Sequence, residues 1–128
     1  MKTTCYLFSV CYLFSVVTFL GGSLAYASGD AVIGKQLYSA RCMACHSIDE
    51  NLAGPAHRGV VGRNAGSVTG FDYSPALKKS KVIWNEKTID QWLTNPEKFI
   101  PGQNMGISIS DAKEREDLIA YLKIQTKR

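Results

Sequence analysis

Five consecutive residues, Cys42 to His46, carry the side chains and the spacing with the clearest chemistry in this chain. They read Cys-Met-Ala-Cys-His, the pattern by which a c-type haem is attached covalently. Two thiols three residues apart on one turn can add to the two vinyl groups of one porphyrin and form two thioether bonds. The histidine directly after the second cysteine can then bind the iron. The motif therefore predicts one haem c on Cys42 and Cys45, with His46 as the proximal ligand.

The same pair of cysteines admits two other interpretations. In an exported protein, two cysteines at this spacing can form a disulfide or a redox-active dithiol. The adjacent histidine and the absence of a βαβ pattern count against this interpretation. A zinc site would need two more ligands at a related spacing, and the sequence offers none. Haem attachment is therefore the favoured interpretation.

Residues 1–27 have the layout of a secretory signal peptide. Lys2 precedes an apolar stretch over residues 5–20, which is followed by Gly-Gly-Ser and the small-x-small triplet Ala25-Tyr26-Ala27. We expect cleavage after Ala27, which leaves residues 28–128 as a single domain. An uncleaved membrane anchor is the alternative, because the uncharged run is almost long enough to span a bilayer.

The charge pattern and the type of leader narrow the possible functions. After residue 27 the chain holds 14 Lys and Arg against 11 Asp and Glu, an excess of +3 that is spread along the sequence. This pattern gives no support to nucleic-acid binding. The leader lacks the Arg-rich, amphipathic character of a transit peptide, so we expect the bacterial periplasm rather than the mitochondrial intermembrane space.

A helix before the haem motif and a loop after it would position its residues. Asp30 can cap a helix whose apolar residues recur with helical spacing and form one face. These residues are Ile33, Leu37, Tyr38 and Ala40. Residues 49–73 contain five glycines and are loop-like. In so small a domain a loop of this length is expected to wrap around something, which here is the haem.

Three further helices are predicted, each with a capping residue before it. They cover residues 75–81, residues 86–95 and a last segment that starts near 110 or 111 and ends in Lys127-Arg128. Their caps are Ser74, Asn85 and Asp111, and Glu114 can complete a capping box with Asp111. Pro96 ends the second of these helices, and residues 99–105 follow as an extended, turn-rich segment. No strand is predicted, so the fold class is all-α.

Together, these features resemble one protein family. The chain is similar to the class I cytochromes c, in the branch of small soluble electron carriers of bacteria and mitochondria. The resemblance covers essentially all of residues 28–128 and implies the cytochrome c fold, in which three main helices, a short helix and long loops surround one covalently bound haem. The matching motifs are Cys42-Met-Ala-Cys-His46, Gly54-Pro55, Gly59-Val-Val-Gly-Arg63, Gly66-Ser-Val-Thr-Gly-Phe-Asp-Tyr73, Asn95-Pro96, Ile100-Pro-Gly102 and Glu114-Arg-Glu-Asp-Leu-Ile-Ala-Tyr-Leu122.

The resemblance implies a role for each residue of the haem site. Cys42 and Cys45 would form the thioethers, and His46 would be the proximal ligand. Pro55 would accept the outer ring N–H of His46 through its carbonyl. Met105 matches the distal methionine that supplies the sixth ligand. Three further residues match the partners of the haem propionates: Arg63, Tyr73 and Trp84.

The resemblance also implies how the first and last helices meet. Gly34 and Tyr38 match positions that cross Leu118 and Tyr121. A glycine at such a crossing lets the two backbones approach closely. The haem motif directly follows the first of these helices.

Several positions near the predicted distal ligand depart from the family pattern. Trp92 replaces a tyrosine that often hydrogen-bonds the methionine sulfur, and an indole can donate but not accept. Gln103-Asn104 stands where Thr-Lys is usual before the methionine. Elsewhere, Ile107 replaces a phenylalanine near the haem edge and Leu77 replaces a buried asparagine. These changes touch the packing and hydrogen bonding that tune the iron, but they remove no ligand.

Two side chains compete for the sixth coordination position. Met105 is favoured because it follows a Pro-Gly turn that can present a side chain to the iron. Of the other methionines, Met1 is lost with the signal peptide and Met43 lies between the two cysteines. His57 is the rival and would give bis-histidine iron. In the family pattern, however, His57 lies in the proximal loop beside Pro55, where an exposed or hydrogen-bonded histidine is expected.

The implied function is transfer of single electrons by a soluble, monomeric carrier that is not an enzyme. Its redox partners would be a cytochrome bc complex, a terminal oxidase, a photosynthetic reaction centre or a periplasmic dehydrogenase. A haem-based ligand-binding sensor and a membrane-tethered subunit of a respiratory or dehydrogenase complex are the alternatives. Since Glu97 and Asn104 stand where lysines are common, we expect a weaker salt dependence of partner reduction than in strongly basic members of the family.

Overall fold

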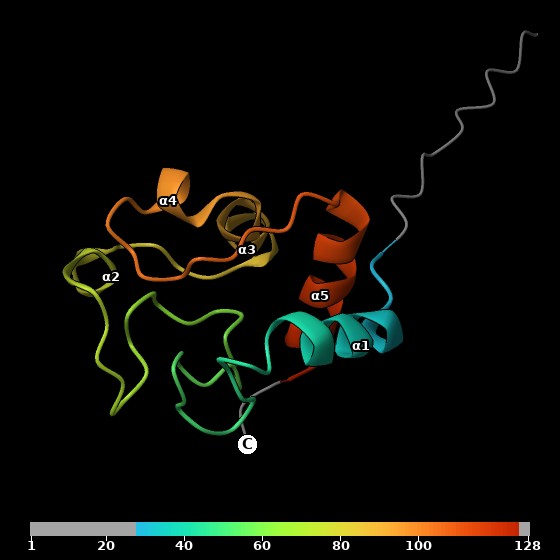
Figure 1. The fold of residues 1–128 in the computed structure, drawn as a ribbon, viewed down its shortest axis with the longest axis horizontal. Helices are drawn as coiled ribbons and strands as arrows, with labels where there is room; N and C mark the ends of the chain where they lie inside the picture. Colours follow the sequence, from blue (N-terminus) through green and yellow to red (C-terminus); the bar gives the residue numbers. More distant parts are fainter. Residues whose placement is uncertain (1–27, 126–128) are drawn as a thin grey trace, which may run out of the picture.

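The helices of this chain, seen in a computed structural model that describes residues 28–125, confirm the all-α prediction (Figure 1). Three longer helices and two short ones are joined by long loops. In chain order they are α1 (Ala31–Arg41), α2 (Pro75–Lys79), α3 (Glu86–Thr94), α4 (Pro96–Phe99) and α5 (Ala112–Ile124). The described part of the chain has no strand, only an isolated antiparallel bridge between Asn64 and Ile83.

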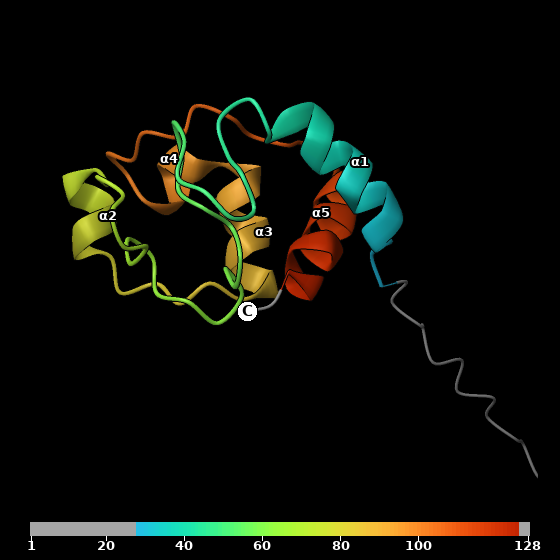
Figure 2. The ribbon, with the colours of Figure 1, turned by 90° about the horizontal axis from the view of Figure 1, so that it is seen from below.

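The helices α1 and α5 cross in direct backbone contact (Figures 1 and 2). A Cβ atom placed on Gly34 would lie 1.9 Å from the carbonyl oxygen of Asp117, so only glycine fits at the crossing. One turn further along α1, the ring of Tyr38 packs against that of Tyr121, with centroids 5.3 Å apart. The expected apolar face of α1 is wrong in part, because Ile33 is 42% exposed. The buried stripe is formed by Gly34 and Tyr38, which confirms the crossing that the resemblance implies.

A buried carboxylate ties the start of α1 to α5. The predicted cap is confirmed, since the Asp30 side chain accepts a hydrogen bond of 2.7 Å from the amide of Val32. The amide of Asp30 itself donates to Oδ1 of the buried Asp117, at 2.6 Å. Lys113, one turn earlier on α5, pairs with the same carboxylate oxygen. This network fixes where α1 begins.

The predicted end of one helix is wrong because a tertiary contact intervenes, and one short helix was not predicted. The helix expected over residues 75–81 stops at Lys79, and the extended chain after it pairs with the loop before it. The carbonyl of Val82 accepts from the amide of Ala65 at 2.8 Å, a bond that a longer helix would prevent. Helix α4 was not predicted. Pro96 both ends α3 and occupies the first position of α4, a place where proline is well tolerated.

The caps of the later helices are as predicted, but one capping box is not. Asp111 accepts from the amide of Glu114 at 3.0 Å, whereas the Glu114 side chain pairs with Arg41 of α1. A reciprocal box exists instead between Asn85 and Thr88 at the start of α3. Helix α5 ends at Ile124 rather than in Lys127-Arg128, which lies outside the described residues.

The segment 49–73 is a loop, as predicted, and its backbone hydrogen bonds reach other parts of the chain. The amide of Gly62 donates to the carbonyl of Trp84 at 2.7 Å, and the amide of Trp84 donates to the carbonyl of Arg63 at 2.8 Å. In Figure 1 this loop, drawn in green, lies below α3 and α4. None of the helices in residues 28–125 combines the length and apolar character of a membrane span.

The Asp117 network predicts a loss of stability in acid. The hydrogen bond from Lys113 lowers the pKa of Asp117 below its ordinary value, against the opposing effect of burial. A carboxyl with a lowered folded-state pKa stabilises the fold above its unfolded value of about 3.9, and this contribution disappears as the pH falls below it. Asp117→Asn should therefore lower the unfolding free energy at pH 7 by about 1.5–3 kcal/mol and lose less stability between pH 5 and pH 3 than the wild type.

Denaturant unfolding of the haem-loaded protein at several pH values measures both quantities. Glu116→Gln is the matched control, because it changes an exposed neighbouring acid in the same way. Equal losses in acid for the wild type and Asp117→Asn would contradict the prediction.

Candidate haem site

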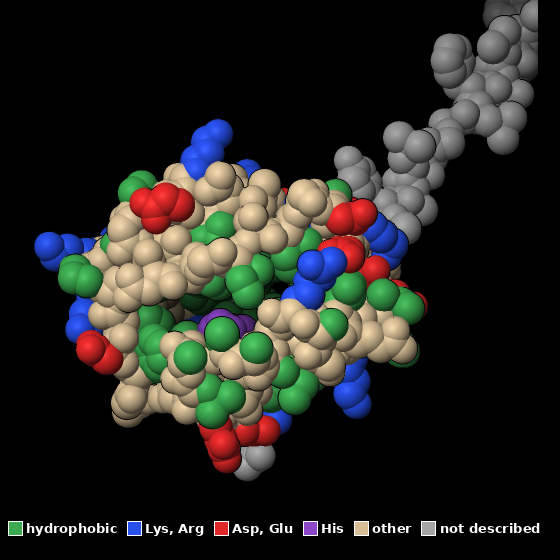
Figure 3. All heavy atoms as spheres, viewed as in Figure 1, with side chains coloured by type: hydrophobic (Ala, Val, Ile, Leu, Met, Phe, Trp, Pro, Cys, Tyr) green, Lys and Arg blue, Asp and Glu red, His purple; other side chains and the backbone are tan. Residues whose placement is uncertain are grey.

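A cavity of about 360 Å³ lies between α1, α3, α5 and the loop 49–73. Figure 3 shows its mouth as a hollow with a histidine side chain at the floor and hydrophobic side chains around it. The volume is in the range of cofactor pockets. All eight residues that the sequence assigned to the site line this cavity: Cys42, Cys45, His46, Pro55, Arg63, Tyr73, Trp84 and Met105.

The two cysteines and His46 share one turn that directly follows α1. The amides of Cys45 and His46 both donate to the carbonyl of Cys42, at 3.0 and 2.8 Å. The turn is anchored to α1 because the amide of Cys42 donates to the carbonyl of Tyr38 at 2.9 Å. Burial raises the pKa of the Cys42 thiol to about 11, so its sulfur is uncharged at neutral pH. Both cysteines line the cavity from this one turn, where two thioether bonds to one porphyrin could form.

The imidazole of His46 is held in the protonation state of an iron ligand. Its Nδ1 lies 2.9 Å from the carbonyl oxygen of Pro55. A carbonyl can only accept, so Nδ1 carries the proton and Nε2 keeps the lone pair that can bind a metal. Burial lowers the pKa of His46, and the hydrogen bond to Pro55 partly offsets this effect. The ring is therefore neutral at pH 7.

Gly54 makes the room for this ring. A Cβ atom at this position would lie 2.2 Å from Cε1 of His46 and 2.5 Å from its Nδ1, distances that no real side chain allows. The amide of Gly54 donates to the carbonyl of Cys45 at 2.7 Å, so the glycine is tied to the haem motif. The Gly54-Pro55 pair thus supplies both space and a hydrogen-bond acceptor to the same imidazole.

The thioether of Met105 receives a hydrogen bond from Trp92. The indole Nε1 donates to the sulfur over 3.1 Å. A thioether sulfur has two lone pairs, so the one not used by the indole is available to a metal. Trp92 is buried at the edge of the Trp84 ring, with centroids 5.4 Å apart. The replacement of tyrosine by tryptophan therefore preserves a donor to this sulfur.

The loop that carries Met105 is held by two residues whose part in it the sequence did not reveal. The carboxylate of Glu97 accepts from the amide of Gly102 at 3.0 Å and from the side chain of Gln103 at 3.3 Å. The side-chain oxygen of Gln103 in turn accepts from the amide of Met105. No local pattern signals these contacts, because they close a turn across five or six residues. They show what the departures Glu97 and Gln103 do in this chain.

Arg63 and Tyr73 place hydrogen-bond donors at the cavity wall. The guanidinium of Arg63 donates to the carbonyls of Arg58 and Ala56, at 3.0 and 2.9 Å. Its Nε is buried without a partner, which is costly for a charged group. The hydroxyl oxygen of Tyr73 accepts from the amide of Val68 at 3.3 Å, so its own hydrogen can still be donated. A propionate carboxylate would satisfy these donors, so the residues present fit a haem.

His57 lies against His46, which argues against its being the sixth ligand. The two rings are stacked with centroids 4.1 Å apart, and imidazoles on opposite sides of one porphyrin cannot touch. His57 is half-buried and lies 3.1 Å from the hydroxyl of Tyr38 through its Nδ1. Burial, with the nearby His46 and Arg63, lowers the pKa of His57 to about 3.

Comparison with known proteins agrees with this site. The family model described as cytochrome c matches residues 31–125. The chain is 42% identical to cytochrome c 2.1 of Caenorhabditis elegans and 44% identical to a cytochrome c of Gibberella zeae, over 77% and 79% of its length and 92% and 99% of theirs. The solved structure of cytochrome cH from Methylobacterium extorquens superposes with a TM-score of 0.72 at 44% identity, over 75% of this chain and 99% of that one.

The chain therefore belongs to the cytochrome c family. It is an electron carrier, and its cofactor is a covalently attached haem c.

The contact between Gly54 and His46 predicts that Gly54→Ala disturbs the proximal ligand. The added methyl group forces the imidazole to move, at a cost of about 1–3 kcal/mol, and should convert part of the ferric protein from low-spin to high-spin. The optical spectrum measures this change. Ser39→Thr is the control, because it adds one methyl group at an exposed position of α1 that does not line the cavity. An unchanged low-spin spectrum in Gly54→Ala would contradict the predicted contact.

Proposed function

We propose that this cytochrome carries single electrons between redox proteins through a haem iron bound by His46 and Met105. The observation that supports this proposal is the hydrogen bond from Trp92 to the Met105 sulfur in the cavity that also holds His46. Together, the two ligands would leave iron no open position for a substrate. We therefore also propose that the protein catalyses no reaction of its own.

The residues of the site would keep the iron environment constant while electrons pass. When bound, haem c supplies an iron that alternates between Fe(III) and Fe(II). Thioether sulfur is a soft ligand that favours the ferrous state, so Met105 would raise the reduction potential relative to bis-histidine ligation. Pro55 and Gly54 hold the His46 ring, whereas Glu97 and Gln103 hold the Met105 loop. Such fixed ligands need little rearrangement on oxidation.

Arg63, Tyr73 and Trp84 would bind the propionate end of the haem. The Arg63 guanidinium is already fixed by two carbonyls of the loop 49–73, so its unpaired Nε–H is oriented before the carboxylate arrives. A charge-assisted hydrogen bond to a carboxylate is stronger than one between neutral groups. These residues would also keep water away from two negative charges within a largely apolar cavity.

A ligand-binding sensor is disfavoured by the contacts of Met105. A sensor would need this methionine to be absent from the iron or easily displaced. The indole of Trp92 holds the sulfur, and the side chain of Gln103 holds the backbone amide of the same residue. Electron transfer is therefore the function that the site supports better.

We further propose that the protein is exported to the bacterial periplasm and acts there as a soluble monomer after cleavage at Ala27. The leader, residues 1–27, lies outside the described residues, so this proposal and its tethered alternative rest on the sequence pattern. A cytochrome bc complex, a terminal oxidase, a reaction centre or a periplasmic dehydrogenase would be the partner. Mass spectrometry of the exported protein would show whether its first residue is Ser28.

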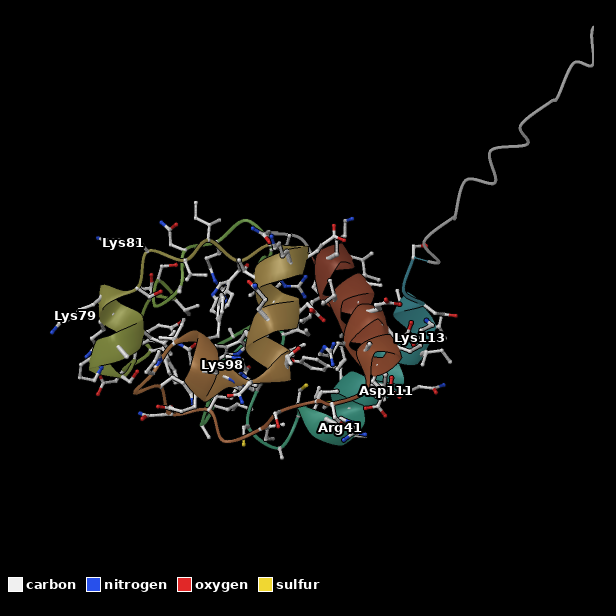
Figure 4. The ribbon with its side chains drawn as sticks, turned by 90° about the horizontal axis from the view of Figure 1, so that it is seen from above. Arg41, Lys79, Lys81, Lys98, Asp111 and Lys113 are labelled. Atoms are coloured by element: carbon white, nitrogen blue, oxygen red, sulfur yellow. The ribbon has the colours of Figure 1, made fainter. Side chains whose placement is uncertain are left out.

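The apolar rim of the cavity indicates how a partner would dock. Ile107 lines the cavity and is exposed, and Met43 and Leu52 are exposed beside lining residues in the chain. Arg41, a charged lining residue, pairs with Glu114 at 2.8 Å. Figure 4 shows Lys79 and Lys81 beside α2 and Lys98 on α4, apart from Arg41 at the end of α1. We infer transient docking through apolar contacts, with little electrostatic steering.

The sixth ligand predicts a specific optical signature. The ferric haem-loaded protein should show the weak far-red charge-transfer band of methionine sulfur bound to Fe(III). Met105→Leu should abolish the band and lower the reduction potential, because it removes the sulfur at nearly constant volume. Met43→Leu is the matched control and should change neither quantity. Absence of the band from the wild type, with high-spin or bis-histidine features, would reject the proposed function.

Weak steering predicts a shallow dependence of electron-transfer rates on ionic strength. With ferricyanide as the oxidant, the slope of log rate against the square root of ionic strength should correspond to an effective charge below the net charge of the haem-loaded protein, which is the +3 of residues 28–128 reduced by the two haem propionates. Ile107→Lys should steepen the slope, because it adds charge at the cavity mouth. Val32→Lys adds the same charge at an exposed position of α1 and should change it less. A wild-type slope that corresponds to this full net charge, or a steeper one, would contradict this prediction.

A further inference from the structure

His57 and Tyr38 have no part in the site as the sequence predicted it, yet both lie against the proximal residues. The imidazole of His57 stacks on that of His46, with centroids 4.1 Å apart and planes inclined by 19°. Its Nδ1 lies 3.1 Å from the hydroxyl oxygen of Tyr38, which meets the ring edge-on. The sequence predicts an exposed or hydrogen-bonded histidine at this position but not its partner, because nineteen residues separate His57 from Tyr38.

The backbone places His57 beside His46 independently of the ring contact. The amide of His57 donates to the carbonyl of Ser47 at 3.0 Å, and the amide of Arg58 donates to that of Ile48 at 2.7 Å. The segment after Pro55 is thus bonded to the segment directly after His46. Because two backbone bonds fix the spacing, the stacked geometry does not depend on a single flexible side chain.

Tyr38 connects this stack to the crossing of α1 and α5. Its side chain is 2% exposed and packs on Tyr121 of α5, with planes inclined by 52°. Its carbonyl accepts from the amide of Cys42, so the same residue also anchors the haem motif. The rings of Tyr121, Tyr38, His57 and His46 therefore form a continuous series of contacts from the helix crossing to the predicted iron ligand.

We propose that Tyr38 and His57 are positioning residues that set the plane of the His46 imidazole. The hydrogen bond to Pro55 fixes one atom of this ring, Nδ1, and a ring held at one atom can still turn about that point. A second ring stacked on its face removes this freedom. The hydroxyl of Tyr38 in turn prevents His57 from rotating away, since turning would break its hydrogen bond. The inference rests on the proposed role of His46 as an iron ligand.

The test compares Tyr38→Phe, which removes a single oxygen atom, with the wild type in the ferrous, haem-loaded state. Nuclear magnetic resonance reports the ring protons of His46, whose shifts depend on their orientation to the porphyrin, and the exchange of its Nδ1–H with solvent. In Tyr38→Phe we expect both ring-proton shifts to change and this exchange to become about fivefold to tenfold faster, the effect of losing one hydrogen bond. His57→Ala should change both readouts in the same direction and by more.

Tyr121→Phe is the matched control, because it removes the same atom one contact further from His46. It should leave the His46 shifts and the exchange rate at wild-type values. Unchanged His46 signals in Tyr38→Phe, or equal changes in Tyr121→Phe, would overturn the proposal. A wild type without iron-bound His46 signals would instead reject the proposed function, so the two failures are distinguishable. Tyr38→Phe keeps the ring and its packing and is the deciding variant even where His57→Ala fails to fold.

Discussion

The close approach of α1 and α5 at Gly34 is the constraint on which the rest of the structure depends. The backbone of α5 occupies the space of the missing side chain, and Asp117 is therefore near enough to accept a hydrogen bond from the amide of Asp30, the residue that caps α1. This fixes the position and the start of α1, and the haem motif directly follows the other end of the helix. A helix held at a greater distance would leave the cysteines and His46 without a defined place.

The site then uses backbone groups to orient side chains that the motif supplies. A carbonyl from Pro55 determines which nitrogen of His46 is protonated, and the absence of a Cβ at Gly54 determines where the ring can lie. On the methionine side, an indole and an amide side chain do similar work for Met105. Proteins of this size have little core, so a haem in the cavity lined by α1, α2, α3, α5 and the loop 49–73 would be part of the packing.

The residues that depart from the family pattern make identifiable contacts in this structure. Trp92 retains a donor to the methionine sulfur, and Glu97 binds the loop that carries Met105. Glu97 lacks the positive charge of the lysine that is common at this position, but its carboxylate accepts two hydrogen bonds that hold the loop of Met105, the proposed sixth ligand. The chain thus combines hydrogen bonds that hold the Met105 loop with an apolar rim around the cavity.

The sequence by itself determined the haem attachment, the all-α class, the caps at Asp30, Asn85 and Asp111 and the long loop, because spacing, capping and glycine content are local properties. Only the tertiary structure decided where α2 and α5 end, that Ile33 of α1 is exposed, and that Glu97, Gln103, Tyr38 and His57 support the two predicted ligands. These features depend on hydrogen bonds and ring contacts between groups that the fold, not their order in the chain, brings together.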